Sequence, residues 1–327
     1  MNDAILAEGL VKRYKEVTAL DGIDLRVPEG SVLALLGPNG AGKTTAVKIL
    51  TTLIAADSGR AEVAGIDVAA DPRGVRRLIG VSGQYAAVDE YLTGFENLEM
   101  VGRLYHLGRR ASAERARELL VQLRLDDAAD RPAKTYSGGM QRRLDLAAAL
   151  VHSPRVLFLD EPTTGLDPVS RKTIWEEVRE LNDEGTTVFL TTQYLEEADQ
   201  LADNVGIIDS GRIVAEGTPE QLKGEIGNPH VELLVGEGSV TAAEEACRAL
   251  GKLLPPKDGK RVLLEVEHGA ADIPRVVRAL DEAGIGVESL ELVRPTLDDV
   301  FVAKTGYHLE EEESEGEGEA TEEPATA

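Results

Sequence analysis

An eight-residue glycine-rich segment constrains this chain more than any other feature of its sequence. It lies between an apolar run at 32–36, typical of a buried strand, and an apolar helical stretch at 44–54. Glycines let successive backbone amides converge without Cβ clashes, and the N-terminus of the following helix adds positive potential. The segment matches G-x-x-x-x-G-K-[ST] and predicts a phosphate-binding loop. Its residues are Gly37, Pro38, Asn39, Gly40, Ala41, Gly42, Lys43 and Thr44.

A pair of acidic residues ends a second apolar run. Val156–Leu159 is followed by Asp160, Glu161 and Pro162. Carboxylates at the end of a buried strand are costly unless a cation or strong donors satisfy them. Asp160 can hold Mg²⁺, as can the Thr44 hydroxyl, and Glu161 is placed to polarise a water beside the γ-phosphate. Alone, this segment also fits a strand followed by an acidic turn; the glycine-rich loop upstream favours the phosphate site.

Apolar runs and helical stretches alternate from residue 1 to about 225. Short continuous apolar runs between helices predict buried parallel strands in an α/β sheet. The runs are Val32–Leu36, Ile79–Val81, Val156–Leu159, Val188–Leu190 and Val205–Ile208.

A turn-rich segment at 224–229 predicts a joint between this region and a smaller one. The order of elements beyond it suggests a small α+β domain. Residues 309–327 are rich in Glu, Gly and Pro and contain too little apolar surface to fold. The strands expected in the smaller region are 230–235, 261–266 and 287–293, and the expected helices are 241–250 and 272–284.

The chain is acidic. Its 327 residues contain 59 Asp and Glu against 35 Lys and Arg, a net charge of −24. Nine Glu residues lie in 309–327; without them 50 acidic residues remain against 35 basic ones, a net charge of −15. Proteins that bind the nucleic-acid backbone need a basic surface, so this balance argues against that class. It leaves room for a local cationic site that binds a phosphorylated small molecule.

The single cysteine and the few histidines argue against a disulfide framework and against a metal site built from these residues. Cys247 is the only cysteine, so a disulfide framework is impossible, and the sequence fits a reducing cytoplasm. The five histidines are scattered without ligand spacing. The N-terminus lacks the apolar region of a signal peptide, and no run approaches the ~18 apolar residues of a membrane span. We therefore expect a partner to cross the membrane if the protein works there.

A second anion-binding surface is predicted at 136–141 (YSGGMQ), directly before a helical stretch at 142–153. Ser137 is a good helix N-cap, and a serine with two glycines at a helix N-terminus can bind an anion. By itself the segment fits a plain capped helix equally well. Two predicted phosphate-binding surfaces in one chain indicate a phosphate-binding function more strongly than either surface alone.

Taken together, these motifs resemble the nucleotide-binding domain of ATP-binding-cassette (ABC) ATPases. The glycine-rich loop, 137–141 (SGGMQ), 157–162 (LFLDEP) and 165–168 (GLDP) follow that family's order and spacing over about 225 residues. The resemblance implies an α/β P-loop NTPase fold of ABC-ATPase type with a helical subdomain, here followed by a small C-terminal α+β domain. The expected domains are an ATP-binding domain at 1–225, the small domain at 230–308 and a disordered acidic tail at 309–327.

The resemblance also implies ATP and Mg²⁺ as cofactors and a head-to-tail homodimer with two composite sites. In such a dimer the signature segment of one subunit closes over ATP held by the other. Catalysis is assigned to Glu161, Gln84 and Gln193, and Mg²⁺ to Thr44, Gln84 and Asp160. Binding within one subunit is assigned to Tyr14, Gly37, Pro38, Asn39, Gly40, Ala41, Gly42, Lys43, Thr44 and Thr45. Binding from the partner is assigned to Ser137, Gly138, Gly139, Gln141 and Asp167.

Three of these assignments have specific roles in the family. Tyr14 matches the aromatic residue that stacks on adenine, although a lone tyrosine at a strand edge is an equal alternative. Gln84 matches the glutamine that reaches the metal and the attacking water and links the site to the membrane partner. Asp167 matches a residue that crosses the dimer interface; it also suits the N-cap of a helix that begins at Pro168.

Gln193 departs from the general family pattern. Most members have a histidine there that contacts the γ-phosphate. A glutamine amide can donate a hydrogen bond to phosphate but carries no titratable proton. We therefore expect Glu161 to be the general base and Gln193 to sense the γ-phosphate.

Four segments are similar to one subgroup, the ATP-binding subunits of daunorubicin/doxorubicin-resistance exporters: 82–98, 135–150, 191–203 and 295–306. In that subgroup, glutamine is usual at the switch position. The subgroup implies an ATPase at the cytoplasmic face of the cell membrane that energises efflux of a hydrophobic drug or lipid-like compound through a separate permease. For the small C-terminal domain, dimer support, permease docking and simple stabilisation all stay open.

Two alternatives keep the same ATPase chemistry. An importer subunit would share every catalytic residue, and only the 295–306 ending favours the exporters. A soluble ABC ATPase acting on nucleic acid usually carries two cassettes, zinc modules or a long coiled coil. Here fewer than 100 residues separate Thr45 from Ser137, without cysteine pairs or sustained heptads.

Overall fold

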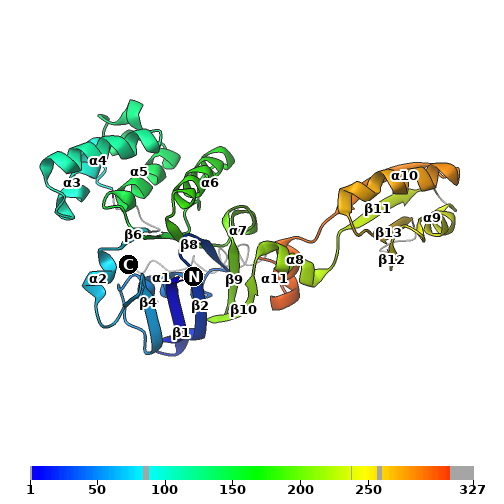
Figure 1. Cartoon of the computed structure of the whole chain (residues 1–327), viewed down its shortest axis with the longest axis horizontal. Coiled ribbons are helices and arrows are strands. Elements are labelled where there is room, and N and C mark those ends of the chain that lie inside the picture. Colours follow the sequence, from blue (N-terminus) through cyan, green and yellow to red (C-terminus); the bar gives the residue numbers. More distant parts are fainter. Residues whose placement is uncertain (1, 84–87, 237, 256–259, 310–327) are drawn as a thin grey trace, which may run out of the picture. The chain divides into compact units, whose positions relative to one another are not determined.

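The computed structural model describes residues 2–83, 88–236, 238–255 and 260–309. These residues form two compact units (Figure 1). The first runs to Pro219 and resumes at Lys304, and the second spans Glu220–Ala303. None of the helices in the described ranges is long and apolar enough to cross a membrane.

A six-stranded sheet forms the centre of the first unit, in the order β10-β9-β3-β8-β7-β6. All neighbours are parallel except β10 and β9. Every residue of β3, β7 and β8 is buried, as expected where both faces of a parallel sheet are covered. The five strands predicted from apolar runs are confirmed. The strands are β3 (Val32–Leu36), β6 (Ile79–Ser82), β7 (Val156–Asp160), β8 (Thr187–Thr192), β9 (Asn204–Asp209) and β10 (Arg212–Gly217).

A second, antiparallel sheet in this unit was not predicted from the sequence. Charged residues such as Glu8, Lys12 and Arg13 interrupt the apolar pattern of its first strand. Its apolar side chains share one core with β3, β7, β8 and the helix α1 (Lys43–Leu50). The sheet has the order β2-β1-β4-β5 and consists of β1 (Asp3–Tyr14), β2 (Val17–Pro28), β4 (Ser58–Val63) and β5 (Ile66–Asp67).

Three helices gather in a helical subdomain, shown in green and cyan at the upper left of Figure 1: α3 (Gly94–Leu104), α4 (Arg109–Gln122) and α5 (Gly138–Leu150). A capping box starts α3, because Thr93 accepts from the backbone N–H of Glu96 while the Glu96 carboxylate accepts from that of Thr93. The other helices of the first unit are α2 (Pro72–Arg76), α6 (Pro168–Asp183) and α7 (Leu195–Leu201), with short 3-10 turns at Asp126–Ala128 and Ala133–Thr135.

The second unit contains a four-stranded antiparallel sheet in the order β12-β13-β11-β14. Apolar side chains of its strands and of α9 and α10 form a separate core. The three strands and two helices predicted here are present, within a few residues of the expected limits. The three-residue strand β12 was missed because it is too short to show a period. The elements are α8 (Pro219–Ile226), β11 (His230–Val235), α9 (Val240–Cys247), β12 (Lys252–Leu254), β13 (Arg261–Glu265), a 3-10 turn (Gly269–Asp272), α10 (Ile273–Glu282), β14 (Val287–Val293) and α11 (Leu297–Thr305).

One buried carboxylate in the first unit carries a stability cost. Glu177 in α6 is 1% exposed, and neither of its carboxylate oxygens has a hydrogen-bond partner among the described residues. Burial raises the pKa of Glu177 to about 8, although Arg143 and Arg124 favour the charged form. The folded protein therefore holds a proton between about pH 4.5 and 8 that the unfolded chain has released, so stability falls as the pH rises through this interval.

We expect Glu177→Gln to stabilise the protein at pH 8 and to have little effect near pH 4.5. The amide keeps the shape of the side chain and removes the buried charge. One pKa unit corresponds to about 1.4 kcal/mol, so the gain in the free energy of unfolding at pH 8 is on the order of 2–4 kcal/mol. Urea unfolding at a series of pH values measures it. Glu176→Gln, at an exposed position of the same helix, is the matched control. Parallel pH profiles for wild type and Glu177→Gln would contradict the prediction.

Candidate nucleotide site

Three of the predicted site segments follow parallel strands at the same edge of the six-stranded sheet. Leu36 in β3 lies opposite Thr192 in β8, and Asp160 in β7 lies opposite Thr191. The segments after these strands therefore leave the sheet side by side. This register brings together the glycine-rich loop, the acidic pair and the segment that begins at Gln193.

The glycine-rich loop links β3 to α1, as predicted, and two of its glycines have no substitute. Gly42, the N-cap of α1, has φ = 111°, and a Cβ there would collide with the carbonyl oxygen of Ala19. A Cβ at Gly37 would collide with the carbonyl oxygen of Ile208. The loop thus packs against two neighbouring backbone segments. Pro38, Asn39, Gly40 and Ala41 complete it, and Lys43, Thr44 and Thr45 form the first turn of α1.

Lys43 is the cation of the site and is only 4% exposed. Its ammonium donates to the carbonyl oxygens of Gly37 (2.6 Å) and Pro38 (2.9 Å). Its Nζ also lies 3.4 Å from Oε1 of Glu161, whose side chain is 7% exposed. A buried ion pair of this kind needs further hydrogen bonds to offset desolvation, and the two loop carbonyls supply them.

Hydroxyl and carboxylate oxygens meet beside this pair. Asp160, 5% exposed, accepts at Oδ1 from the hydroxyls of Thr191 (2.6 Å) and Thr44 (3.2 Å). Mg²⁺ prefers such oxygen ligands and commonly takes only one or two from protein, with phosphate and water as the others. Thr44 and Asp160 thus fit the metal predicted for them. No group of three or more His, Cys, Asp or Glu in the described part of the chain forms a metal cage.

The backbone at Glu161 is held in an unusual conformation. Its φ is 51°, in the left-handed region that side chains other than glycine rarely adopt. The Glu161 N–H donates to the carbonyl oxygen and to the hydroxyl of Thr191, both at 3.1 Å. Strained backbone of this kind persists where the surroundings fix it, and here it directs the carboxylate toward Lys43.

Thr191 is a site residue that the sequence analysis missed. Its hydroxyl contacts both acidic residues of the pair, donating to Asp160 and accepting from the Glu161 N–H. A threonine within the apolar run of β8 gives no signal except its position one strand away from an acidic strand end. Arg142, also missed, is described below.

Of the two glutamines predicted to be catalytic, the structure describes only Gln193. Gln193 directly follows β8 and is half-buried at the edge where the other groups meet. Gln84 lies outside the described residues, so its predicted metal contact stays a prediction.

The residues predicted to act on a partner's ATP occupy two helix N-termini. Ser137 caps α5 by accepting from the Met140 N–H at 3.3 Å, and both Ser137 and Gly138 are exposed. Gly139 is buried, and Gln141 donates to the Ala133 carbonyl at 3.3 Å. The exposed start of α5 is therefore accessible to an anion.

Asp167 has the helix-capping role that the sequence offered beside a contact across the dimer interface. It caps α6 by accepting from the N–H groups of Val169 and Ser170, both at 3.0 Å, and from the Ser170 hydroxyl at 2.6 Å. These bonds, led by the Ser170 hydroxyl, lower the pKa of Asp167. Its carboxylate is exposed, so capping and a contact across an interface are compatible.

Tyr14 ends β1 and is 46% exposed. The Lys12 ammonium lies 5.7 Å from the ring centroid. The free ring surface suits stacking on a base, and the position is equally that of a strand-edge aromatic residue.

A buried carboxylate connects the segment after Glu161 with the segment after Gln193. Glu197, on α7, is fully buried, and its Oε1 accepts from the Thr163 hydroxyl (2.8 Å) and from the indole N–H of Trp175 in α6 (2.9 Å). Burial raises the pKa of Glu197, and these donors oppose that shift. Arg171 also stacks 4.2 Å from the ring centroid of Tyr194. Helices α6 and α7 are thus joined beside the site.

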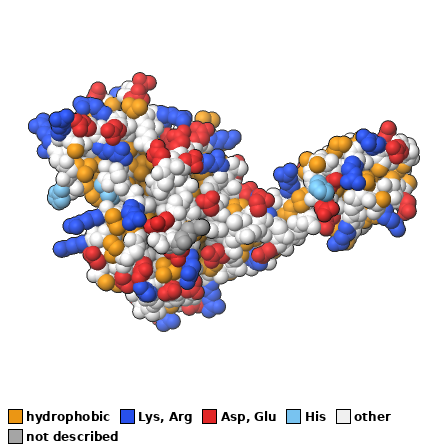
Figure 2. All heavy atoms as spheres, viewed as in Figure 1, with side chains coloured by type: hydrophobic (Ala, Val, Ile, Leu, Met, Phe, Trp, Pro, Cys, Tyr) orange, Lys and Arg blue, Asp and Glu red, His pale blue; other side chains and the backbone are white. Residues whose placement is uncertain are grey.

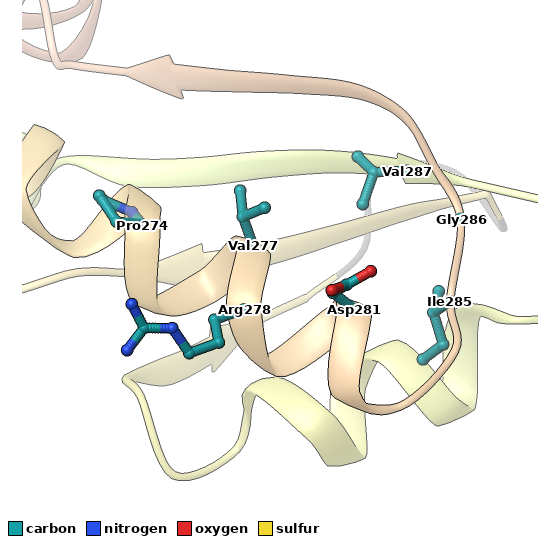
Figure 3. A pocket seen from close by; sticks show the side chains of 7 residues that line it. All are labelled: Pro274, Val277, Arg278, Asp281, Ile285, Gly286 and Val287. Atoms are coloured by element: carbon teal, nitrogen blue, oxygen red, sulfur yellow. The ribbon is translucent and has the colours of Figure 1, made fainter.

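A groove of about 630 Å³ lies in the second unit (Figure 3). It is formed by α10 and the approach to β14, and it contains none of the predicted site residues. Its lining mixes apolar side chains with one cation and one anion: Pro274, Val277, Arg278, Asp281, Ile285, Gly286 and Val287.

Two protein families match the chain. The ABC transporter family matches residues 20–164, and the family described as ATP-binding protein DrrA1-3-like, C-terminal domain, matches residues 217–305. The chain is 53% identical to the daunorubicin resistance ATP-binding protein DrrA2 of Streptomyces coeruleorubidus, over 95% of this chain and 98% of the relative. It is 38% identical to the Nod factor export ATP-binding protein I of Burkholderia thailandensis, over 92% and 96% of the two chains.

A solved structure shares the fold of the first unit. It is a dimer of the ATP-binding cassette MJ0796 in a post-hydrolysis state, bound to ADP and Pi. The TM-score is 0.61 at 26% sequence identity, with 65% of this chain and 98% of that chain covered. The chain therefore belongs to the ABC transporter family, as an ATP-binding and ATP-hydrolysing subunit of the DrrA group.

Proposed function

We propose that this ATPase energises the efflux of a hydrophobic drug or lipid-like compound through a separate membrane permease, at the cytoplasmic face of the membrane. The observation that carries the ATPase half is the contact of Lys43 with Glu161 beside the oxygen cluster of Thr44 and Asp160. The export half is supported by the relatives, whose names specify drug resistance and export.

Within one subunit, the loop amides and Lys43 bind the phosphates of ATP, and Tyr14 stacks on adenine. Thr44 and Asp160 would hold Mg²⁺, with Gln84 as the third proposed ligand, and the metal would neutralise charge on the outer phosphates. Lys43 must leave the carbonyls of Gly37 and Pro38 to reach a phosphate. That movement separates its ammonium from Glu161 and frees the carboxylate to polarise the attacking water. Positioning and charge neutralisation supply most of the catalysis in this class of reaction.

The complete site is proposed to form between two copies of the chain. The exposed start of α5 offers an anion-binding surface that is available for a second copy, and the MJ0796 cassette was solved as a dimer. Each ATP then joins two subunits, and its hydrolysis favours opening. The residues assigned to the partner's ATP are Ser137, Gly138, Gly139, Gln141 and Asp167.

The proposed division is an ATP-binding domain at 1–225, a small domain at 230–308 and a tail at 309–327. The two compact units support a separate small domain, although the first unit ends at Pro219 and the chain rejoins it at Lys304. The acidic balance of the chain, a net charge of −24, disfavours action on nucleic acid. On the face seen in Figure 2, acidic side chains are interspersed among the basic ones.

Replacing Glu161 tests the general base and the dimer together. We expect Glu161→Gln to lower the ATPase kcat at least 100-fold, within the range for loss of a general base, and to accumulate an ATP-bound dimer. Phosphate release and light scattering with and without ATP measure both effects. The exposed Glu196→Gln is the matched control. A monomeric Glu161→Gln protein at saturating ATP would contradict the composite site.

Gln193 is expected to donate a hydrogen bond to the γ-phosphate. Loss of a hydrogen bond to a charged group costs about 1.5–3 kcal/mol, so we expect Gln193→Ala to lower kcat roughly 10- to 100-fold. Gln193→His, which keeps a donor, should retain most of the turnover. Steady-state ATPase assays compare the three proteins. Undiminished turnover in Gln193→Ala would remove Gln193 from the mechanism.

The direction of transport is tested in cells that produce the chain with its permease. We expect such cells to retain less of a fluorescent hydrophobic drug than cells with the Glu161→Gln chain and the same permease. An importer would produce the opposite difference, so the sign of the change in retained fluorescence decides between the two.

A further inference from the structure

We propose that Arg142 is a positioning residue that fixes the strained Glu161 loop and the segment leading to Gln84 against helix α5. This role rests on the ATPase mechanism proposed above and adds a residue to it. The proposal rests on one observation: the buried guanidinium of Arg142 donates hydrogen bonds to main-chain oxygens of the Glu161 loop and of the segment that leads to Gln84.

The hydrogen bonds of Arg142 end on carbonyls that surround the catalytic groups. Its Nε donates to Pro162 (2.7 Å), and one terminal nitrogen donates to Asp160 (3.2 Å) and Glu161 (3.1 Å). The other terminal nitrogen donates to the carbonyl oxygen of Gly83 at 2.5 Å. Three successive peptide units after β7 are thus tied to the residue directly before Gln84.

Burial of this cation is balanced by a neighbouring carboxylate. The Arg142 side chain is 13% exposed, and burial lowers its pKa. Asp145, 2% exposed and one turn further along α5, lies 3.7 Å away. The Ser82 hydroxyl at the end of β6 donates to Asp145 at 2.5 Å. Arg142 and Asp145 therefore connect α5 to both segments that bear the proposed catalytic residues.

Only an arginine can make this set of contacts. Its planar guanidinium presents five N–H donors in a fixed fork, whereas a lysine ammonium is a compact point with three. Glu161 needs such support because its φ is positive. A glutamate without restraints would relax to a more favourable backbone conformation. Without the hydrogen bonds from Arg142 to the carbonyl oxygens of Asp160, Glu161 and Pro162, the loop can relax. Its relaxation would carry the Glu161 carboxylate away from the attacking water.

Arg143 provides a matched control. It is the next residue of the same helix and also donates to two main-chain carbonyls, those of Leu123 and Arg124, both at 3.1 Å. Those acceptors belong to the helical subdomain and not to the catalytic segments. A general loss of helix anchoring therefore affects Arg143→Lys as much as Arg142→Lys, whereas loss of Glu161 positioning affects Arg142→Lys alone.

The test compares kcat and the KM for ATP in wild type, Arg142→Lys and Arg143→Lys. We expect Arg142→Lys to lower kcat at least 10-fold with KM changed less than 3-fold, and Arg143→Lys to change both less than 3-fold. In the Glu161→Gln background, adding Arg142→Lys should lower the residual rate by a smaller factor than it lowers the wild-type rate, because no base remains at position 161 to be positioned. Wild-type turnover in the same preparation tests the proposed activity separately from the role of Arg142.

Three results would overturn the proposal: equal kinetics in the two lysine variants, an increase in KM with kcat unchanged, or an undiminished effect of Arg142→Lys in the Glu161→Gln background. If Arg142→Lys does not fold, Asp145→Asn gives the second test, since it keeps an acceptor for Ser82 and removes the charge beside the guanidinium. It should lower kcat several-fold with KM unchanged, and an unchanged kcat would also overturn the proposal.

Discussion

The buried contact between Lys43 and Glu161 is the interaction on which the organisation of the site depends. A cation and an anion out of water are stable only when their remaining hydrogen-bonding groups are satisfied. The glycine-rich loop supplies carbonyls to the ammonium, and Thr191 and Arg142 hold the backbone that bears the carboxylate. The parallel register of β3, β7 and β8 brings these groups to one edge. Sheet, loop and helix α5 are thus parts of one electrostatic arrangement.

The contact also explains how a substrate can alter the site. In the proposed mechanism, a phosphate of ATP attracts the same ammonium that neutralises Glu161, so binding of ATP competes with the ion pair. Pairing and release of the proposed base then require no large movement of the fold. The strained backbone of Glu161 keeps the carboxylate in place while its partner changes.

Local patterns predicted the elements in which neighbouring residues suffice to determine the structure. Residues close in sequence determine the apolar runs of the parallel strands, the loop pattern that ends at Thr44 and the serine cap of α5. The antiparallel sheet was missed because charges interrupt the apolar pattern of its strands and because its central pairing, of β1 with β4, joins segments far apart in sequence. The roles of Arg142 and Thr191 left no signal, since both bind main-chain atoms of segments that only the fold brings near. Asp167 fitted two roles from sequence, and the structure describes its capping role.

The chain contains a single tryptophan, and its position gives the molecule a built-in optical reporter. The indole of Trp175 is 5% exposed and bonded to the carboxylate that also binds Thr163, two residues after Glu161. Indole emission responds to the charge and polarity around the ring. Rearrangement of the segment after Glu161, or of α7 after Gln193, is therefore expected to change the emission wavelength and intensity of one fluorophore. Tryptophan emission then offers a readout of the proposed catalytic cycle that needs no added label.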